Sequence, residues 1–366
     1  MRDISKYKGC LIGGAIGDAL GYAVEFTPED EIFQQYGPLG ITRYDLSKGK
    51  AIISDDTQMT LFTAAGLLNG QAQGKLYHPG ADVTECIRKA YLDWYLTQTE
   101  TFPLPEDKMK KDFLLKETEL FARRAPGNTC MTALSMGGTG AIEVPVNHSK
   151  GCGGVMRVAP IGLYFIDCDG WTVEDIDLLG AQAAAITHGH ELGYIPSAAL
   201  VHIVYLLASG QKRDVLSAVR DSLSAMQRIF PGSKEMGYIQ AIMQTAIMLA
   251  QSDMDDLSAI HKIGGGWVAE ETLAIAVYCA LKYQNDFEKA IIASVNHSGD
   301  SDSTGAVTGN ILGAYLGYDA IPEVFLQHLE LNDLTLEVAD ELCGNAPQEY
   351  RYCSVRMEYE ENKNRN

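Results

Sequence analysis

Two short acidic segments stand directly before stretches with helical periodicity, and their residue types could bind metal ions. Their oxygen-bearing residues include Ser54, Asp55, Asp56, Asp300, Asp302 and Ser303. Helix capping alone explains one such segment, because a side-chain oxygen accepts from the first free N–H groups of a helix. If both segments converge, their carboxylates repel one another unless cations lie among them. Oxygen ligands favour Mg²⁺, Mn²⁺ or Ca²⁺, and such a set suffices for two ions. Spacing alone leaves capping and metal binding both open.

A third acidic pair, Asp18 and Glu25, lies in the glycine-rich segment 9–25. The two residues are two helical turns apart, so a helix over 9–25 would carry both on one face. A hydrogen-bonded buried acid explains Asp18 equally well. Glu25 comes just before Thr27 and Pro28, where the helix is expected to end, and could reach toward a ligand.

Two glycine-rich segments could bring backbone N–H groups close to a phosphate. They are Gly-Cys-Gly-Gly at 151–154 and three glycines at 264–266. Glycine lets the backbone approach an anion closely, but a P-loop lysine is absent and a simple turn explains either segment. His188 and His190 do not share a helical face, and no cysteine has zinc-site spacing. We expect a core or substrate-contacting histidine instead. No nucleophile elbow or cysteine–histidine dyad is evident.

Helical periodicity dominates the chain. The best strand candidate, 41–46, is short, and loops are expected at 27–53, 100–107 and 125–155, of which the last is long enough to suggest a functional role. Helices are predicted at 9–25, 57–69, 83–97, 173–187, 197–209, 212–229, 237–251, 270–283 and 303–317.

Glycine recurs at every fourth position in two of the predicted helices. The two sets are Gly9, Gly13, Gly17, Gly21 and Gly305, Gly309, Gly313, Gly317. Each glycine costs about 1 kcal/mol relative to alanine inside a helix, so close backbone contact is expected to compensate. The pattern predicts two buried and neighbouring helices, with glycine-rich loops as the alternative.

Composition indicates a protein of the reducing cytosol. The chain has 366 residues, with 29 Lys and Arg, 48 Asp and Glu, and a net charge of −19, which opposes non-specific binding to nucleic acid. Its 8 cysteines form no CxxC pair. The N-terminus lacks the apolar core of a signal peptide, and no long apolar run suggests a membrane span. We therefore expect a cytoplasmic protein with neither a nucleic-acid nor a membrane partner.

Five motifs in one order closely resemble the ADP-ribosylglycohydrolase family. They are GDALGYAVEF (17–26), SDDT (54–57), GCGGVMRVAP (151–160), THGHELGY (187–194) and GDSDSTGA (299–306). The resemblance runs from about residue 6 to residue 320. It implies an all-α fold, a compact orthogonal multi-helix bundle. We assign residues 1–354 to a single domain of this type and 355–366 to a polar C-terminal tail.

The same resemblance implies a two-metal site, with Mg²⁺ or Mn²⁺ as cofactors. The implied metal ligands are Ser54, Asp55, Asp56, Asp300, Asp302 and Ser303. The implied catalytic residues are Asp302, which would orient the water, Asp56, and Glu25 near the bond to be cleaved. The implied substrate-binding residues are Ser149, Lys150, Gly151, Cys152, Gly153, His188, Trp267 and Val268. Cys152 stands where some family members carry asparagine.

The implied activity is hydrolysis of the glycosidic bond between ADP-ribose and a protein side chain. The many acidic residues would favour a guanidinium leaving group, so ADP-ribosyl-arginine is the first expectation, and an ADP-ribosylated protein the expected partner. The alternatives are a hydrolase of ADP-ribosyl-serine or O-acetyl-ADP-ribose, or a non-catalytic ADP-ribose-binding protein. Intact acidic clusters favour the enzyme.

Overall fold

The computed structural model of the chain describes residues 2–76, 78–105 and 112–344. Within these ranges helices are the regular secondary structure, and no strand is present beyond isolated bridges. The predicted all-α class is therefore confirmed. The predicted tail at 355–366 and the domain end at 354 lie outside the described residues.

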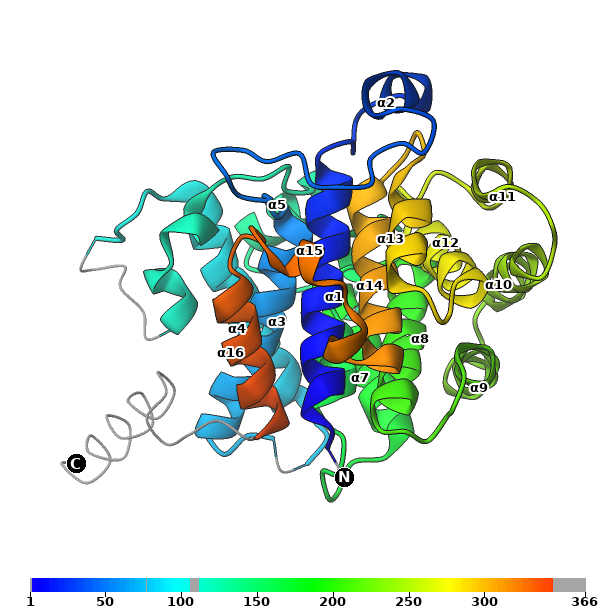
Figure 1. Ribbon diagram of the computed structural model, residues 1–366. Helices are drawn as coiled ribbons and strands as arrows, with labels where there is room; N and C mark the ends of the chain where they lie inside the picture. The colour runs from blue at the N-terminus through cyan, green and yellow to red at the C-terminus, as the bar shows by residue number, and fades with distance from the viewer. Residues whose placement is uncertain (1, 77, 106–111, 345–366) are drawn as a thin grey trace, which may run out of the picture.

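The helices surround a central pair and are connected mostly by short loops (Figure 1). Their bounds are α1 (Ile4–Tyr22), α2 (Glu29–Tyr36), α3 (Asp55–Ala72), α4 (Ala81–Thr99), α5 (Asn128–Ser135), α6 (Ala159–Tyr164), α7 (Val173–Ala185), α8 (Glu191–Ala208), α9 (Val215–Ile229), α10 (Met236–Ala250), α11 (Asp256–Ile263), α12 (Ala269–Lys282), α13 (Phe287–Val295), α14 (Ser301–Leu316), α15 (Glu323–Leu326) and α16 (Asn332–Cys343). Short 3-10 helices cover Phe113–Lys116, Thr118–Phe121, Cys152–Gly154 and Tyr318–Ala320.

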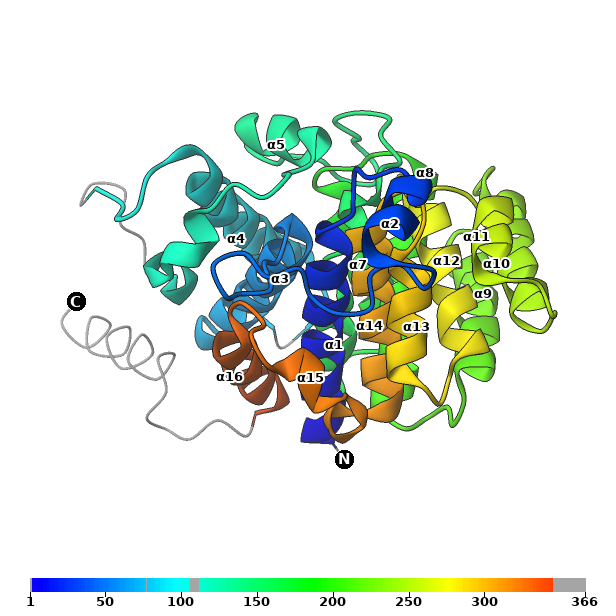
Figure 2. The same ribbon diagram turned by 45° about the horizontal axis from the view of Figure 1, so that its top comes forward.

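Helices α1 and α14 lie side by side in the middle of the molecule (Figures 1 and 2). They run antiparallel, and their glycines face each other so closely that no side chain fits between them. A Cβ atom at Gly17 would lie 2.0 Å from the carbonyl oxygen of Gly305, and one at Gly9 would lie 2.4 Å from that of Gly313. This confirms that the glycine stripes mark buried neighbouring helices. Gly317, however, follows α14 and has a left-handed φ of 87°, so it ends the helix.

Two layers flank the central pair and complete the orthogonal bundle. In Figure 1, α3, α4 and α16 lie on one side and α12 and α13 on the other, while α9, α10 and α11 are seen nearly end-on and so cross the direction of α1. In the described part of the chain, α8 is the one helix long and apolar enough to cross a membrane, and 89% of that stretch is buried inside the protein. Its apolar composition is thus that of a core helix.

Each predicted helix overlaps an observed one, but four other predictions, of one strand, two loops and one helix end, were wrong. Residues 41–46 form no strand, because both backbone groups of Ile41 pair with the side chain of Asn296 instead of a neighbouring strand. The predicted loops at 27–53 and 125–155 contain α2 and α5. The first helix ends at Tyr22 instead of residue 25, so Glu25 lies in the turn that follows.

Candidate active site

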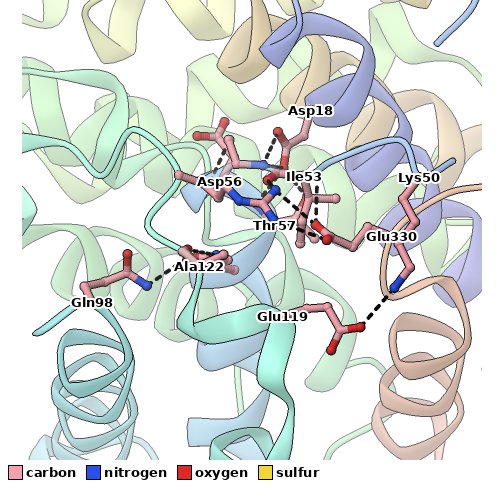
Figure 3. A network of polar contacts seen from close by, with 12 residues as sticks. Asp18, Lys50, Ile53, Asp56, Thr57, Gln98, Glu119, Ala122 and Glu330 are labelled. Atoms are coloured by element: carbon pink, nitrogen blue, oxygen red, sulfur yellow. Dashed lines mark hydrogen bonds and ion pairs between the residues drawn. The ribbon is translucent and has the colours of Figure 1, made fainter. Parts of the chain in front are cut away.

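The C-terminal end of α1 meets the N-terminal end of α3 through a buried carboxylate. Asp18 is fully buried and accepts hydrogen bonds from the backbone N–H groups of Ser54, at 2.9 Å, and Thr57, at 3.0 Å, and from the Thr57 hydroxyl (Figure 3). Burial and the negative charge of Asp302 raise the pKa of Asp18 to about 7, against the effect of these donors. Asp18 is therefore the hydrogen-bonded buried acid that the sequence allowed, and it fixes the start of α3.

A second buried carboxylate, Glu330, holds the residues that lead into α3 (Figure 3). Its Oε2 accepts from the Ile53 N–H at 3.3 Å, and both of its oxygens accept from the Arg124 guanidinium, each at 3.3 Å. The Arg124 carbonyl in turn accepts from the Asp55 N–H at 3.2 Å. The predicted metal ligands of this segment are thus positioned from both ends of the chain.

The two acidic segments converge on one cavity of about 640 Å³. Capping is also real, since Asp300 accepts from the Ser303 N–H at 3.4 Å and Ser54 accepts from the Asp56 N–H at 3.2 Å. The residues of the acidic segments that line the cavity are Asp55, Asp56, Asp300, Asp302 and Ser303, and Glu25 lines it beside them. Ser54 is fully buried and is not among the lining residues.

Glu25 belongs to the closest group of carboxylates. Ligand oxygens of Glu25, Asp300 and Asp302 lie within 4.8 Å of one another, so these three could hold one cation. The sequence placed Glu25 beside the scissile bond and not among the ligands. Asp55 and Asp56 lie outside this close group on the same cavity wall, and Asp55 Oδ2 accepts from the Gly127 N–H at 3.2 Å.

The electrostatics of the cavity fit divalent cations. Burial, followed by the charges of Asp302 and Asp300, raises the pKa of Glu25 to about 10. Burial and the charge of Asp302 also raise the pKa of Asp55, Asp56 and Asp300 well above its usual value. Oxygens Glu25 Oε2 and Asp56 Oδ2 are buried without a hydrogen-bond partner. Such a set of crowded, partly unpaired oxygens is the donor set that Mg²⁺ and Mn²⁺ prefer, and a cation among them would lower these pKa values.

The glycine-rich segment 151–154 forms another wall of the cavity. Gly151, Cys152 and Gly153 line it, and the backbone of this segment pairs with the segment before α12 through a bridge between Gly151 and Val268. The Cys152 thiol lies 2.8 Å from Asp300 Oδ2 and donates to it. The wall therefore contacts the carboxylate group directly.

Three of the predicted substrate-binding residues lie behind this wall and do not line the cavity. They are Ser149, Lys150 and Val268. Lys150 forms an ion pair with buried Glu270 at the start of α12, and its carbonyl accepts from the Ala269 N–H at 2.9 Å. Ser149 Oγ accepts from the Gly151 N–H at 3.3 Å. In the structure these residues support the loop.

The two histidines of the motif at 187–194, His188 and His190, have different roles in the structure. His188 lines the cavity, and burial, with a smaller effect of the Arg157 charge, lowers its pKa to about 3, so the ring is neutral. His190 caps α8, its Nδ1 accepting from the Leu192 N–H at 3.1 Å. Because each ring has its own task, the alternative of a zinc pair gains no support from the described residues.

Sequence reasoning missed several residues of the cavity wall. Phe26 stacks on Trp267 with ring centroids 5.7 Å apart, and the two side chains remain 70% and 44% exposed, so they form an aromatic edge of the cavity. Proximity to Glu25 was the one signal that could have identified Phe26. Further lining residues are Arg123, Ala125, Pro126, Gly127, Asn128, Thr129, Cys130 and Met156. The length of the expected loop at 125–155 pointed to part of this set.

Comparisons with known proteins agree with the motifs. The family model described as ADP-ribosylglycohydrolase matches residues 1–351. ADP-ribosylhydrolase ARH3 of Homo sapiens is 27% identical over 202 residues, which are 50% of this chain and 54% of that protein, so the chain spans about half the length of this relative. The ADP-ribosyl-(dinitrogen reductase) glycohydrolase of Rhodospirillum rubrum is 26% identical over 340 residues, covering 88% of this chain and 90% of that protein.

Two more matches extend over most of the chain. The ADP-ribosylarginine hydrolase Tri1 of Serratia proteamaculans is 25% identical over 351 residues, covering 95% of this chain and 81% of that protein. A solved structure, an ADP-ribosylglycohydrolase-related protein complex, shares the fold with a TM-score of 0.59 at 22% identity, covering 94% of this chain and 99% of that chain. The predicted resemblance and the enzyme class are thereby confirmed at the level of the family, and the chain belongs to the ADP-ribosylglycohydrolase family.

Proposed function

We propose that this protein is a hydrolase that depends on two divalent cations and removes ADP-ribose from a modified protein side chain, most readily from arginine. One observation carries the proposal. Carboxylates from the turn after α1 and from the starts of α3 and α14 line one cavity, and two of their buried oxygens lack a hydrogen-bond partner. The names of the Rhodospirillum and Serratia relatives, which specify ADP-ribosylated dinitrogen reductase and ADP-ribosylarginine, support the substrate class.

Mg²⁺ or Mn²⁺ would be held by the acidic and hydroxyl residues at the starts of α3 and α14. The proposed ligands are Ser54, Asp55, Asp56, Asp300, Asp302 and Ser303, with Glu25 close enough to join them. When bound, the ions would attract the ribose hydroxyls and make a water more nucleophilic. Asp302 and Asp56 would orient that water by accepting its protons. The remaining carboxylates would stabilise the positive charge that develops at the anomeric carbon.

The other walls would hold the rest of the substrate. The backbone N–H group of Gly153 suits the diphosphate, because glycine lets an anion approach closely, while the N–H groups of Gly151 and Cys152 donate to Ser149 Oγ and to the Trp267 carbonyl. The exposed rings of Phe26 and Trp267 suit a flat nucleobase. The acidic cavity also favours a cationic guanidinium as leaving group, which is why arginine is the first choice.

The experiment that tests this function is release of ADP-ribose from arginine-modified and from serine-modified protein. Each substrate would be incubated with Mg²⁺, with Mn²⁺ and with a chelator, and the Asp302→Ala variant would serve as the control. Cation-dependent release from arginine alone supports the full proposal. Release from serine or from O-acetyl-ADP-ribose would change the leaving group. Binding of ADP-ribose without any release would replace the enzyme by a binding protein.

We also propose a cytoplasmic location and a single domain over residues 1–354. The cysteines within the described ranges are free, which suits a reducing compartment. Fractionation of the native cells would test the location, and limited proteolysis would test the domain.

A further inference from the structure

His188 presents two different edges to its surroundings. Its Nδ1 lies 2.8 Å from the hydroxyl oxygen of Thr187, and both side chains are buried, with 2% and 0% of their surface exposed. Its Nε2 has no hydrogen-bond partner among the described residues, although the ring lines the cavity. The position of the proton on this ring therefore decides whether Nε2 offers the cavity a hydrogen-bond donor or an acceptor.

The Thr187 hydroxyl has one good acceptor for its proton. Arg157 donates from Nη2 to Thr187 Oγ1 at 2.7 Å, and a guanidinium can only donate. The carbonyl of Ala184 lies 3.5 Å from the hydroxyl and already accepts from the backbone N–H groups of Thr187 and His188. His188 Nδ1 is much closer, at 2.8 Å, and can accept this proton when the ring proton is on Nε2. Thr187 thus donates to Nδ1, and the ring proton of neutral His188 is on Nε2.

Arg157 is itself fixed, so the chain of hydrogen bonds has a rigid origin. Its side chain is completely buried, its Nη2 also donates to the Ala183 carbonyl at 3.1 Å, and its guanidinium lies 4.2 Å from the ring centre of Tyr91. The permanent positive charge of Arg157 also opposes a second proton on the imidazole. Charge therefore keeps the ring neutral, and the hydrogen-bond geometry selects its Nε2–H tautomer.

The glycine-rich wall leaves the Nε2 edge accessible. A Cβ atom at Gly151 would lie 3.4 Å from Nε2, and one at Gly153 would lie 3.3 Å from it and 2.9 Å from Cε1. A side chain at Gly153 would therefore crowd the ring. With glycine at both positions, an oxygen of a bound molecule can approach the Nε2–H group.

We infer that Arg157 and Thr187 are positioning residues, which hold His188 as a neutral Nε2–H donor for an oxygen of the ADP-ribosyl group. This rests on the proposed function for the identity of the ligand. The acceptor is best assigned to the diphosphate, because the acidic wall repels its negative oxygens and a donor beside the Gly153 N–H group offsets that repulsion. Because burial lowers the pKa of His188 to about 3, the ring remains a neutral donor near pH 7.

Nitrogen-15 NMR of protein labelled at histidine tests the tautomer in the absence of substrate. Protonated and unprotonated ring nitrogens of neutral histidine have well-separated signals, and the His188→Asn variant identifies the signals of His188. We expect wild-type protein and Thr187→Ser to show the proton on Nε2. Thr187→Val removes the hydroxyl at nearly constant volume, so we expect a mixture of the two tautomers there.

Calorimetric titration of ADP-ribose in the presence of Mn²⁺ tests the consequence. If Thr187→Val leaves an even mixture of tautomers, ADP-ribose should bind about 2-fold more weakly, because affinity falls by the inverse of the fraction that keeps the proton on Nε2, and Thr187→Ser should restore it. Thr308→Val is the matched control, because its hydroxyl is equally buried and bonds only within α14, to the Thr304 carbonyl.

Three outcomes would overturn the inference. They are a proton on Nδ1 in the wild-type protein, an unchanged tautomer in Thr187→Val, and equal weakening of ADP-ribose binding by Thr308→Val. If wild-type protein does not bind ADP-ribose at all, the proposed substrate fails, while the NMR result still decides whether Arg157 and Thr187 set the tautomer.

Discussion

Replacing Gly309 by alanine tests whether the contact of α1 with α14 holds the active site together. A Cβ atom at Gly309 would lie 1.9 Å from the carbonyl oxygen of Gly13, whereas ordinary van der Waals contact begins at 3.4 Å. The two helices must therefore move apart by about 1.5 Å, the difference between these distances. The Gly13 carbonyl is backbone and the added Cβ is bonded directly to the backbone of residue 309, so no side-chain rotation can relieve the clash.

The expected cost follows from this geometry. Overpacking a core costs about 1–3 kcal/mol, and a clash between two backbones belongs at the upper end of that range. Alanine returns about 1 kcal/mol through its better helix propensity. We therefore expect Gly309→Ala to lower the free energy of unfolding by about 2 kcal/mol or more. Gly237→Ala is the matched control: Gly237 lies in α10, and a Cβ atom added there would meet nothing within 4 Å, so that variant should gain up to about 1 kcal/mol.

Urea unfolding of both variants without metal, followed by Mn²⁺ titration, is the assay. Glu25 follows α1 and Asp302 lies on α14, so separation of these helices should also pull apart the carboxylates that lie within 4.8 Å of one another. Gly309→Ala should therefore bind Mn²⁺ more weakly, and Gly237→Ala should bind it as the wild type does. If the two variants are equally stable, the close packing of the glycine stripes is not what holds α1 against α14.

Three further predictions concern buried acidic and histidine groups. Glu330→Gln should weaken Mn²⁺ binding by roughly 10-fold, as loss of a residue that supports ligands does, while Glu119→Gln, which breaks the exposed ion pair with Lys50, should leave calorimetric Mn²⁺ affinity unchanged. Asp302→Asn should raise the melting temperature of metal-free protein, because it removes buried like-charge repulsion, and should abolish the increase that Mn²⁺ produces; a lower metal-free melting temperature would contradict this. Burial lowers the pKa of His297 from 6.5 to about 4, so the unfolded chain binds this proton first and stability falls as pH drops through that window. The loss approaches about 3 kcal/mol at 1.36 kcal/mol per pKa unit, and unfolding curves of wild type and His297→Gln between pH 4 and 7 should show a steeper slope for the wild type.

The sequence predicted the scaffold better than the site, and the reason is periodicity. Helical spacing located the long helices, and the four-residue recurrence of Gly9 and Gly305 with their successors predicted their contact. Spacing could not show that the start of α3 also lies beside the contact between α1 and α14. That depends on Asp18 and Glu330, whose hydrogen bonds join segments far apart along the chain.

Short elements and supporting residues escaped prediction for a different reason. Helices α2 and α5 have only 8 residues each, too few for a periodic pattern to stand out in a polar stretch. Lys150 and Val268 belong to a motif that suggested substrate contact, which stays a prediction, and the structure adds that Lys150 pairs with Glu270 and that Val268 forms a bridge with Gly151. A motif identifies a local segment, whereas the side of the backbone that faces the ligand depends on the tertiary fold.

The packing of the glycine stripes and the repulsion within the acidic segments act on the same pair of helices. Close packing of α1 against α14 brings buried carboxylates to one end of the pair, where their mutual repulsion opposes the same packing. Cations relieve that repulsion only in the folded state, because the unfolded chain does not assemble the ligands. Binding therefore stabilises the fold by an amount set by concentration, about 2.7 kcal/mol at 100 times the dissociation constant. Since the ions bind only where the packed pair assembles the ligands, occupancy of the site and integrity of the central helix pair depend on each other, and the gain is of the size of the expected Gly309→Ala loss.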